Sequence, residues 1–353
     1  MSSMVVPHDT QTANSILQRV ESEAKEYRNL GLLSDTVEDL IPTWHARVRH
    51  EPTRFLTDGF SIDVDALRNF RRRRIFVTDS PSWDPSPFNP KNLVSGSRRG
   101  TKRVLRENLE VLKQHGYDDL LVKYPCPSIG NPHIFQHQGF RYTFRWFKHI
   151  YFLGLTRRVL GGKLDPDMVA LDIGSSYGVF SGLLKNEYPD SHHILVDFSE
   201  QLLLARYFLS MYFPGARIAG IKDLVEAGTI SRDFVQSYDF VLVPVNIYDS
   251  IAPASADLVM NFSSFGEMSK KWLNHYLESP PFRTARYFLT SNRVQRINAE
   301  NLEINILDYP VLNPGKKLHF GISPVWTYVY RRRRLFLGDA IRVEPHFEYI
   351  GEI

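Results

Sequence analysis

Between residues 164 and 293, short apolar runs alternate with longer segments whose apolar residues recur every three to four positions. The short runs cover residues 168–173, 194–197, 240–244, 256–261 and 286–292, and their length and apolar content are typical of buried strands. Helices are expected from Ser199 to Pro214 and over residues 268–277. Strands that alternate with helices predict a doubly wound, Rossmann-like α/β sheet.

The flanking regions follow different patterns. Periodic apolar positions predict helices over residues 11–30, 98–113 and 140–153, whereas residues 79–90 and 123–138 are rich in proline or glycine and should be irregular. Runs near the end, at 325–330, 334–337 and 347–350, suit strands of an antiparallel sheet edge. We therefore expect a mainly helical region over 1–138, serving as a lid, an acceptor-binding surface or an oligomerisation surface, and a nucleotide-binding domain over 139–353.

The first predicted strand of that domain ends in Asp172 and is followed by a turn that contains Gly174 and Gly178. Glycine permits positive φ and a close ligand approach, so this turn can present N–H groups and a helix N-terminus to a bound molecule. The second strand ends in Asp197, 19 residues after Gly178. This separation is expected for a carboxylate that binds ribose hydroxyls.

The residues of the turn bear on which nucleotide binds. A pyrophosphate needs bare backbone, but Ser176 and Tyr177 fill the turn between the two glycines. S-adenosylmethionine has no phosphate, but it carries a ribose, an ammonium and a sulfonium. Acids at the strand ends can bind such groups, and Asp172 and Asp197 supply these acids. A turn that serves only structure, or that binds another nucleotide, is the alternative.

At these residues the chain resembles the class I S-adenosylmethionine-dependent methyltransferases, whose first motif is roughly D-x-G-x-G-x-G. Ser176 departs from that motif at the middle glycine. The resemblance implies S-adenosyl-L-methionine as cofactor. The residues expected to contact it are Asp172, Gly174, Ser175, Ser176, Tyr177, Gly178, Asp197, Phe198, Asn261 and Ser263.

A polar stretch, residues 261–268, follows the fourth strand at the edge where open α/β sheets bind ligands. Ser264 and Glu267 also have the spacing of a capping box, which would explain them without chemistry. With the aromatic segment 140–142, residues 195–210 and residues 291–293, this stretch resembles bacterial sugar O-methyltransferases of polysaccharide and glycosylated natural-product pathways. The resemblance covers about residues 139–293, and residues 264–268 are its most distinctive part.

Methyl transfer to a hydroxyl requires an aligned acceptor and removal of its proton. Glu267 is the first candidate base and His275 the second, while Asn292 and Arg293 are candidates for holding sugar hydroxyls. No Asn-Pro-Pro-aromatic sequence, typical of amine methylation, follows the fourth strand, which favours oxygen as acceptor. No spacing indicates a metal site, although two separated carboxylates could form one.

Composition and charge limit the kinds of molecule that the protein is expected to bind. The 353 residues carry a net charge of +4, and the runs Arg71–Arg74 and Arg331–Arg334 lack interleaved stacking residues, so they are interpreted as solvated surface and not as a nucleic-acid site. A single cysteine, Cys126, and the lack of a long apolar run predict a cytoplasmic protein without a membrane segment. We expect a small-molecule or glycan acceptor and leave a homo-oligomer open.

Three functions remain from sequence alone. The first is a methyltransferase for a sugar or glycoside hydroxyl, and the second is a methyltransferase for another small molecule or a nucleic acid. The third is a nucleotide-binding protein without catalysis.

Overall fold

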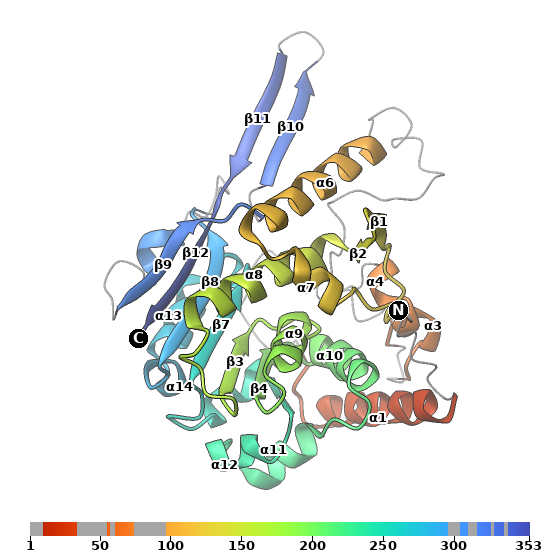
Figure 1. Ribbon diagram of the computed structural model, residues 1–353. Helices are drawn as coiled ribbons and strands as arrows, with labels where there is room; N and C mark the ends of the chain where they lie inside the picture. The colour runs from red at the N-terminus through yellow and green to blue at the C-terminus, as the bar shows by residue number, and fades with distance from the viewer. Residues whose placement is uncertain are drawn as a thin grey trace.

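A computed structural model describes residues 10–33, 55–56, 61–73, 97–295, 304–309, 316–325, 328–334 and 338–353 (Figure 1). The α-helices in these residues are α1 (Thr10–Asn29), α3 (Val64–Arg68), α4 (Phe70–Arg73), α6 (Ser97–His115), α7 (Asp118–Lys123), α8 (Phe144–Leu160), α9 (Val179–Glu187), α10 (Ser199–Tyr212), α11 (Ile221–Ala227), α12 (Arg232–Gln236), α13 (Lys270–Glu278) and α14 (Pro280–Arg283). Short 3₁₀ helices are η3 (Val245–Ser250), η4 (Phe265–Glu267) and η5 (Ile306–Asp308). The strands are β1 (Phe135–His137), β2 (Phe140–Tyr142), β3 (Val169–Ile173), β4 (His192–Asp197), β5 (Ile218–Ala219), β6 (Phe240–Pro244), β7 (Leu258–Phe262), β8 (Tyr287–Arg293), β9 (Lys317–Ile322), β10 (Tyr328–Arg334), β11 (Gly338–Glu344) and β12 (His346–Glu352).

Eight strands form the central sheet in the order β5-β6-β4-β3-β7-β8-β12-β9. The pairs from β5 to β8 are parallel, and β12 runs antiparallel to both of its neighbours, β8 and β9. The predicted doubly wound α/β sheet is therefore confirmed. Because the chain leaves β3 to form β4 on one side and later returns to form β7 on the other, the carboxyl end of β3 is a topological switch point, where such sheets bind ligands.

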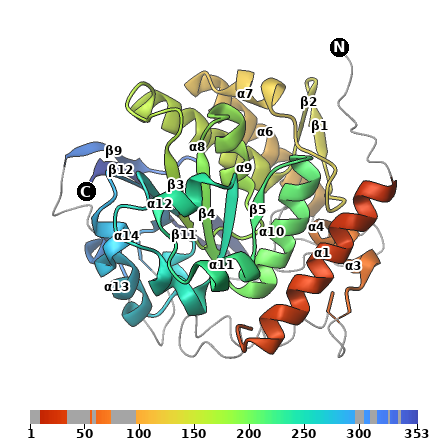
Figure 2. The same cartoon turned by 90° about the horizontal axis from the view of Figure 1, so that it is seen from below.

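Helices cover both faces of the sheet. In the view from below, α8 and α9 lie on one side of the strands and α12, α13 and α14 on the other (Figure 2). The residues of β3 and β6 are buried throughout, as expected for parallel strands covered on both faces. This burial explains why their sequences are continuous apolar runs without alternation.

The first helix packs directly on the domain that holds the central sheet. Helix α1 lies along α10 (Figures 1 and 2), and Glu23 and Arg206 form an almost fully buried ion pair between them. Ser199 donates its hydroxyl to the Leu32 carbonyl, and Phe198 is the N-cap residue of α10. The division at residue 138 stays a prediction.

The aromatic segment predicted as one helix over 140–153 is divided. Residues 140–142 pair with β1 in a hairpin, and α8 begins at Phe144 with Thr143 as N-cap, whose hydroxyl accepts from the Trp146 N–H at 3.2 Å. Thr143 is β-branched and has the extended backbone that is usual for an N-cap residue. The hairpin strand therefore ends before Thr143, and the helix begins after it.

The C-terminal strands also differ from the prediction. Strand β12 enters the central sheet, but β10 and β11 pair only with each other and form a hairpin that projects from the body (Figure 1). The predicted strand over 334–337 is therefore wrong at its start, because Arg334 ends β10; residues 335–337 lie outside the described residues.

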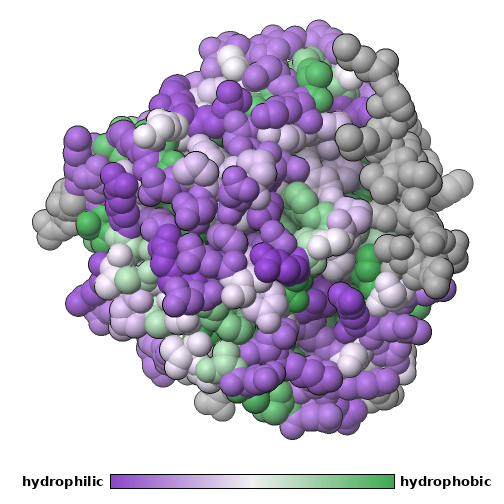
Figure 3. Space-filling view, turned by 60° about the horizontal axis from the view of Figure 1, so that its bottom comes forward, coloured by the Kyte–Doolittle hydropathy of each residue, from purple (hydrophilic) through white to green (hydrophobic). Residues whose placement is uncertain are grey.

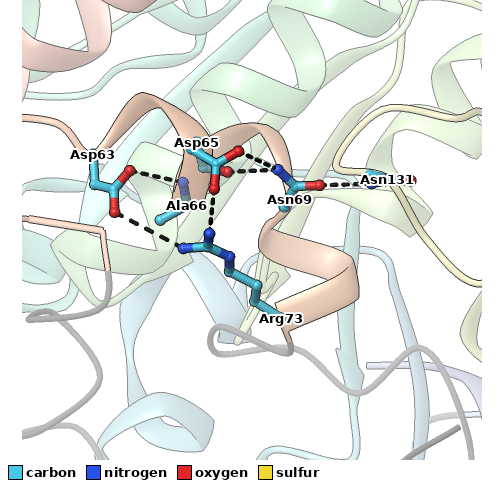
Figure 4. A network of polar contacts seen from close by, with 6 residues as sticks. All are labelled: Asp63, Asp65, Ala66, Asn69, Arg73 and Asn131. Carbon is cyan, nitrogen blue, oxygen red and sulfur yellow. Dashed lines mark hydrogen bonds and ion pairs between the residues drawn. The ribbon is translucent and has the colours of Figure 1, made fainter. Parts of the chain in front are cut away.

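The first arginine run is not simply solvated. Arg71 is 2% exposed, and its guanidinium donates to the Pro127 and Ile129 carbonyls, each at 3.0 Å. Arg73 binds Asp65 and lies 3.9 Å from Asp63, in the network of Figure 4. These contacts correct the interpretation of the run as free surface charge. Arg74 and the proline-rich segment 79–90 lie outside the described residues.

One face of the surface is mainly hydrophilic, with separate small apolar areas (Figure 3). Scattered apolar residues of this kind are usual on a protein surface. None of the described helices is both long and apolar enough to cross a membrane.

Candidate functional site

The turn after β3 has left-handed backbone at three positions, Gly174, Ser176 and Gly178. A Cβ on Gly174 would overlap the side chain of Ser264, which explains the glycine there. Four N–H groups of the turn donate within the protein: Gly174 and Ser175 to the Val196 carbonyl, Ser176 to Asp197 and Gly178 to Ser175. The expected cradle of free amides is therefore largely closed by the turn's own hydrogen bonds.

Asp197 lies at the carboxyl end of β4, beside this turn. Its Oδ2 accepts from the Ser176 N–H at 2.7 Å, and its Oδ1 accepts from the Phe198 N–H at 2.8 Å. Asp197 is 9% exposed. Burial raises the pKa of its carboxyl to about 7, although the two hydrogen bonds act to lower that pKa. An ionised carboxylate has about four acceptor positions, so about two remain for a ligand.

Asp172 is 3% exposed and lies behind the turn. Its Oδ2 accepts from the Ser181 hydroxyl on α9 at 2.8 Å. Burial raises the pKa of Asp172 to about 7, and the bond from Ser181 opposes that shift. The carboxyl thus fixes α9 to the end of β3, a structural role that exists without any ligand.

Two other residues predicted to bind the cofactor are mostly packed. The Tyr177 ring is fully buried and meets Phe70 and Phe208 edge to face, at centroid distances of 5.2 and 5.0 Å. Phe198 is buried at the start of α10. Their side chains therefore support the shape of the site.

Serine hydroxyls line both turns at the switch point. The Oγ atoms of Ser175 and Ser263 are buried and have no hydrogen-bond partner among the described residues. Ser263, like Ser176, has left-handed backbone, a conformation that costs non-glycine residues of the order of 1 kcal/mol or more and often marks a functional site. Unsatisfied hydroxyls beside strained turns are typical of a site that receives a polar ligand.

Asn261 and Asn292 lie side by side on β7 and β8. The Asn261 amide donates to the Ile173 carbonyl at 2.7 Å and to Ser264, and its oxygen accepts from the Phe265 N–H and from Asn292. The Asn292 oxygen accepts from the Gly266 N–H at 3.1 Å. Both side chains are fully buried, so they hold the loop after β7 and have little capacity left for a cofactor or a sugar.

Glu267 ends η4 at the same edge. Its Oε1 lies 3.3 Å from Arg293 Nη2, and each side chain is 25% exposed. Ser264 makes no capping bond, and the following helix is capped instead by Ser269. The capping-box alternative is therefore wrong, while the structure brings together the predicted base and one predicted acceptor ligand.

His275 is placed differently. It lies on α13 with its side chain 38% exposed, and its Nε2 is 3.1 Å from Asp249 Oδ1. Its ring packs against Tyr248 and Trp272. None of the contacts described for the chain joins His275 to Glu267 or to the Gly174–Gly178 turn.

Sequence reasoning missed polar residues at the start of α8. Arg145 Nη1 lies 3.4 Å from Ser176 Oγ, and the His149 ring packs beside Phe180 of α9 and Phe262 of β7, at centroid distances of 5.9 and 5.7 Å. Burial lowers the pKa of Lys148 and of His149, and the charge of Arg145 adds to both shifts. A detectable signal in the sequence was the presence of three basic residues among the aromatic residues of the first two turns of α8.

Metal ligands do not cluster in the described part of the chain. No group of three or more His, Cys, Asp and Glu side chains there could hold an ion.

No family model matches the chain, and no curated protein matches it. Several solved structures are similar to the chain. Precorrin-6y C5,15-methyltransferase of Geobacter metallireducens is 12% identical, with 56% of this chain and 85% of that chain covered and a TM-score of 0.30. The C-terminal domain of the Rhodobacter capsulatus enzyme of that name is 12% identical (58% and 89% covered, TM-score 0.32). Magnesium protoporphyrin IX methyltransferase of Synechocystis, solved with bound S-adenosylmethionine, is 9% identical (57% and 79% covered, TM-score 0.32). Similarity at this level concerns the general fold and identifies neither a family nor a substrate.

Proposed function

We propose that the protein is an S-adenosylmethionine-dependent O-methyltransferase that acts on a hydroxyl of a sugar or glycoside. The observation that carries the proposal is the contact between Asp197 and the Gly174–Gly178 turn at the switch point, with 2.7 Å between Asp197 Oδ2 and the Ser176 N–H. It leaves a carboxylate with acceptor positions to spare at the place where a ribose would lie.

In this proposal, the two ribose hydroxyls donate to Asp197, and the Ser175 and Ser263 hydroxyls meet polar groups of the cofactor. S-adenosylmethionine supplies an activated methyl group. The protein must then hold the acceptor oxygen about 3 to 3.5 Å from that methyl and take up its proton.

Glu267 is the proposed proton acceptor, because it is a partly exposed carboxylate at the carboxyl edge of β7, next to the switch point. Arg293, its partner, would hydrogen-bond the acceptor. The sugar class is supported by the resemblance of residues 139–293 to sugar O-methyltransferases. His275 and Asn292 are not assigned roles, because their contacts within the protein occupy them.

Cofactor binding is tested by calorimetry with S-adenosylhomocysteine. Asp197→Ala should weaken binding at least about tenfold, because two hydroxyl donors lose their acceptor. Wild-type protein should also gain roughly 2.7 kcal/mol of stability at a hundredfold excess over Kd. If the wild type shows neither binding nor stabilisation, the protein is not a methyltransferase of this kind.

The acceptor class is tested separately. Wild-type protein is incubated with labelled S-adenosylmethionine and with free sugars, nucleotide-linked sugars, glycosides, catechols and RNA. Transfer of label to the sugar compounds alone is the expected result. Transfer to catechols or RNA with none to sugars would keep the reaction and reject the substrate class.

A further inference from the structure

The Gly174–Gly178 turn has little capacity to bind an anion through its backbone. Of its amides, those of Gly174, Ser175, Ser176 and Gly178 already donate to acceptors in the protein. An N–H group that is engaged in this way is poorly available to a ligand. An anionic group that lies on this turn would therefore be held mainly by side chains, and a cationic side chain is best suited to its charge.

Arg145 is a cation in the right place. It is the second residue of α8 and is only partly buried. Its Nη1 lies 3.4 Å from Ser176 Oγ, and its guanidinium lies 5.7 Å from the centre of the Tyr177 ring. Its charge also lowers the pKa of Asp197, against the larger raising effect of burial, so the guanidinium lies near that carboxyl as well.

The surroundings of Arg145 fix its position. The Tyr177 ring that it contacts also lies 5.6 Å from the guanidinium of Arg71, and it packs edge to face on Phe70. Arg71 is itself held by the carbonyls of residues 127 and 129. A guanidinium supported on such a rigid ring loses little conformational freedom when it binds a ligand.

This inference rests on the proposed function. S-adenosylmethionine has a single anionic group, the carboxylate of its amino-acid end, and a guanidinium can bind a carboxylate through two parallel hydrogen bonds. We propose that Arg145, with Ser176 beside it, forms a carboxylate-binding subsite for the amino-acid end of the cofactor. Asp197 would hold the ribose and Arg145 the carboxylate, so that the turn positions the sulfonium between two fixed points.

Two ligands isolate this subsite. S-adenosylhomocysteine carries the amino-acid end, whereas 5′-methylthioadenosine keeps the adenosine and the sulfur and lacks that end. Calorimetry with Arg145→Gln should show a loss of roughly 10- to 100-fold in affinity for S-adenosylhomocysteine and less than about threefold for 5′-methylthioadenosine. Arg145→Lys should recover part of the loss, because it keeps the charge without the planar fork.

The matched control is Arg158→Gln. Arg158 is on the same helix and also lies over a tyrosine ring, 5.8 Å from the centre of Tyr117, but at the opposite end of α8. Arg158→Gln should leave the affinities for S-adenosylhomocysteine and 5′-methylthioadenosine unchanged. If Arg145→Gln weakens both ligands equally, or neither, the subsite is rejected while the proposed function stands. If wild-type protein binds neither ligand, the proposed function fails and the subsite fails with it.

Discussion

The two halves of the sheet's carboxyl edge use their polar side chains differently. On the β3–β4 half, Asp197 retains acceptor positions and the Ser175 hydroxyl has no partner in the described residues. On the β7–β8 half, the amides of Asn261 and Asn292 bind each other and the loop that follows. The first half keeps hydrogen-bond capacity at Asp197 and Ser175, whereas on the second half the two amides are engaged and the capacity lies in hydroxyls such as that of Ser263.

This difference indicates where the reacting groups can come from. Because the strand-end amides of the β7–β8 half are occupied, the proposed chemistry on that side rests on Glu267 at the end of η4 and on Arg293 at the end of β8. A rigid edge below a partly exposed acid is the arrangement that positioning an acceptor requires.

The largest effect should come from Glu267→Gln. Glutamine can still accept a hydrogen bond from Arg293, but it cannot take up a proton, so methyl transfer should fall by roughly 10² to 10⁴. S-adenosylhomocysteine affinity and the melting temperature should stay close to those of wild type. Initial rates with the acceptor found in the label screen measure the loss.

Glu278→Gln is the control for that substitution, since Glu278 is an exposed acid at the end of α13. Its rate should be within about threefold of wild type. A fully active Glu267→Gln protein would remove the base assignment and direct attention to His149, whose neutral imidazole packs beside Phe180 and Phe262.

The structural half of the comparison is tested by Asn261→Ala. In a buried region, the change removes the acceptor of the Phe265 N–H, and it leaves the Ile173 carbonyl with Ser264 and the Asn292 amide with Thr290 as remaining partners. We expect a loss of about 2 to 5 kcal/mol in the free energy of unfolding, measured in urea. Asn274→Ala, at an exposed position of α13, should cost less than about 0.5 kcal/mol. Equal effects would show that the amide network does not hold the edge.

The ligand half of the comparison is tested by pH. The pKa of Asp197 is raised to about 7, so in the ligand-free protein its carboxyl gains a proton as pH falls through that value and loses acceptor capacity. S-adenosylhomocysteine affinity should therefore decrease by up to about tenfold per pH unit below about 7. Calorimetry between pH 5.5 and 8.5 measures the slope. Asp197→Asn should bind weakly at every pH, and a slope that persists in this variant would assign the titration to another group.

A smaller effect on stability should come from Asp172. Its folded-state pKa of about 7 lies above the unfolded value of about 3.9, so the folded protein binds more protons between these values. This contribution to the free energy of unfolding is present at low pH and is lost as pH rises from about 4 to 7. Relative to wild type, Asp172→Asn should gain on the order of 1 to 4 kcal/mol between pH 5 and pH 8.

Urea unfolding at the two pH values measures that gain. Asp190→Asn, at an exposed position between α9 and β4, should show no such change. A difference between wild type and Asp172→Asn that does not vary with pH would contradict the titration of Asp172.

The sequence by itself determined the central strands of the sheet and the position of the turn after β3, but it did not reveal the short strand β5 or the edge strand β9. Apolar runs such as residues 169–173 and 240–244 form strands because a buried parallel strand has no solvent face and therefore no polar alternation. The spacing from Gly178 to Asp197 likewise follows from the length of one helix and one strand, so local pattern is enough to place both at the switch point.

Only the tertiary structure decided which polar groups are available. Asn261, Asn292 and Glu267 look equivalent in sequence, as polar residues near strand ends, yet two are used up by cross-strand hydrogen bonds and one remains partly exposed. Arg71 and Arg145 are both arginines beside aromatic residues. Arg71 is buried and donates to carbonyls of a loop that is distant in the chain, whereas Arg145 reaches the turn after β3. The hydrogen-bond capacity that a side chain has left depends on the partners it already binds. Because those partners are far apart in the chain, no local sequence pattern reveals this capacity.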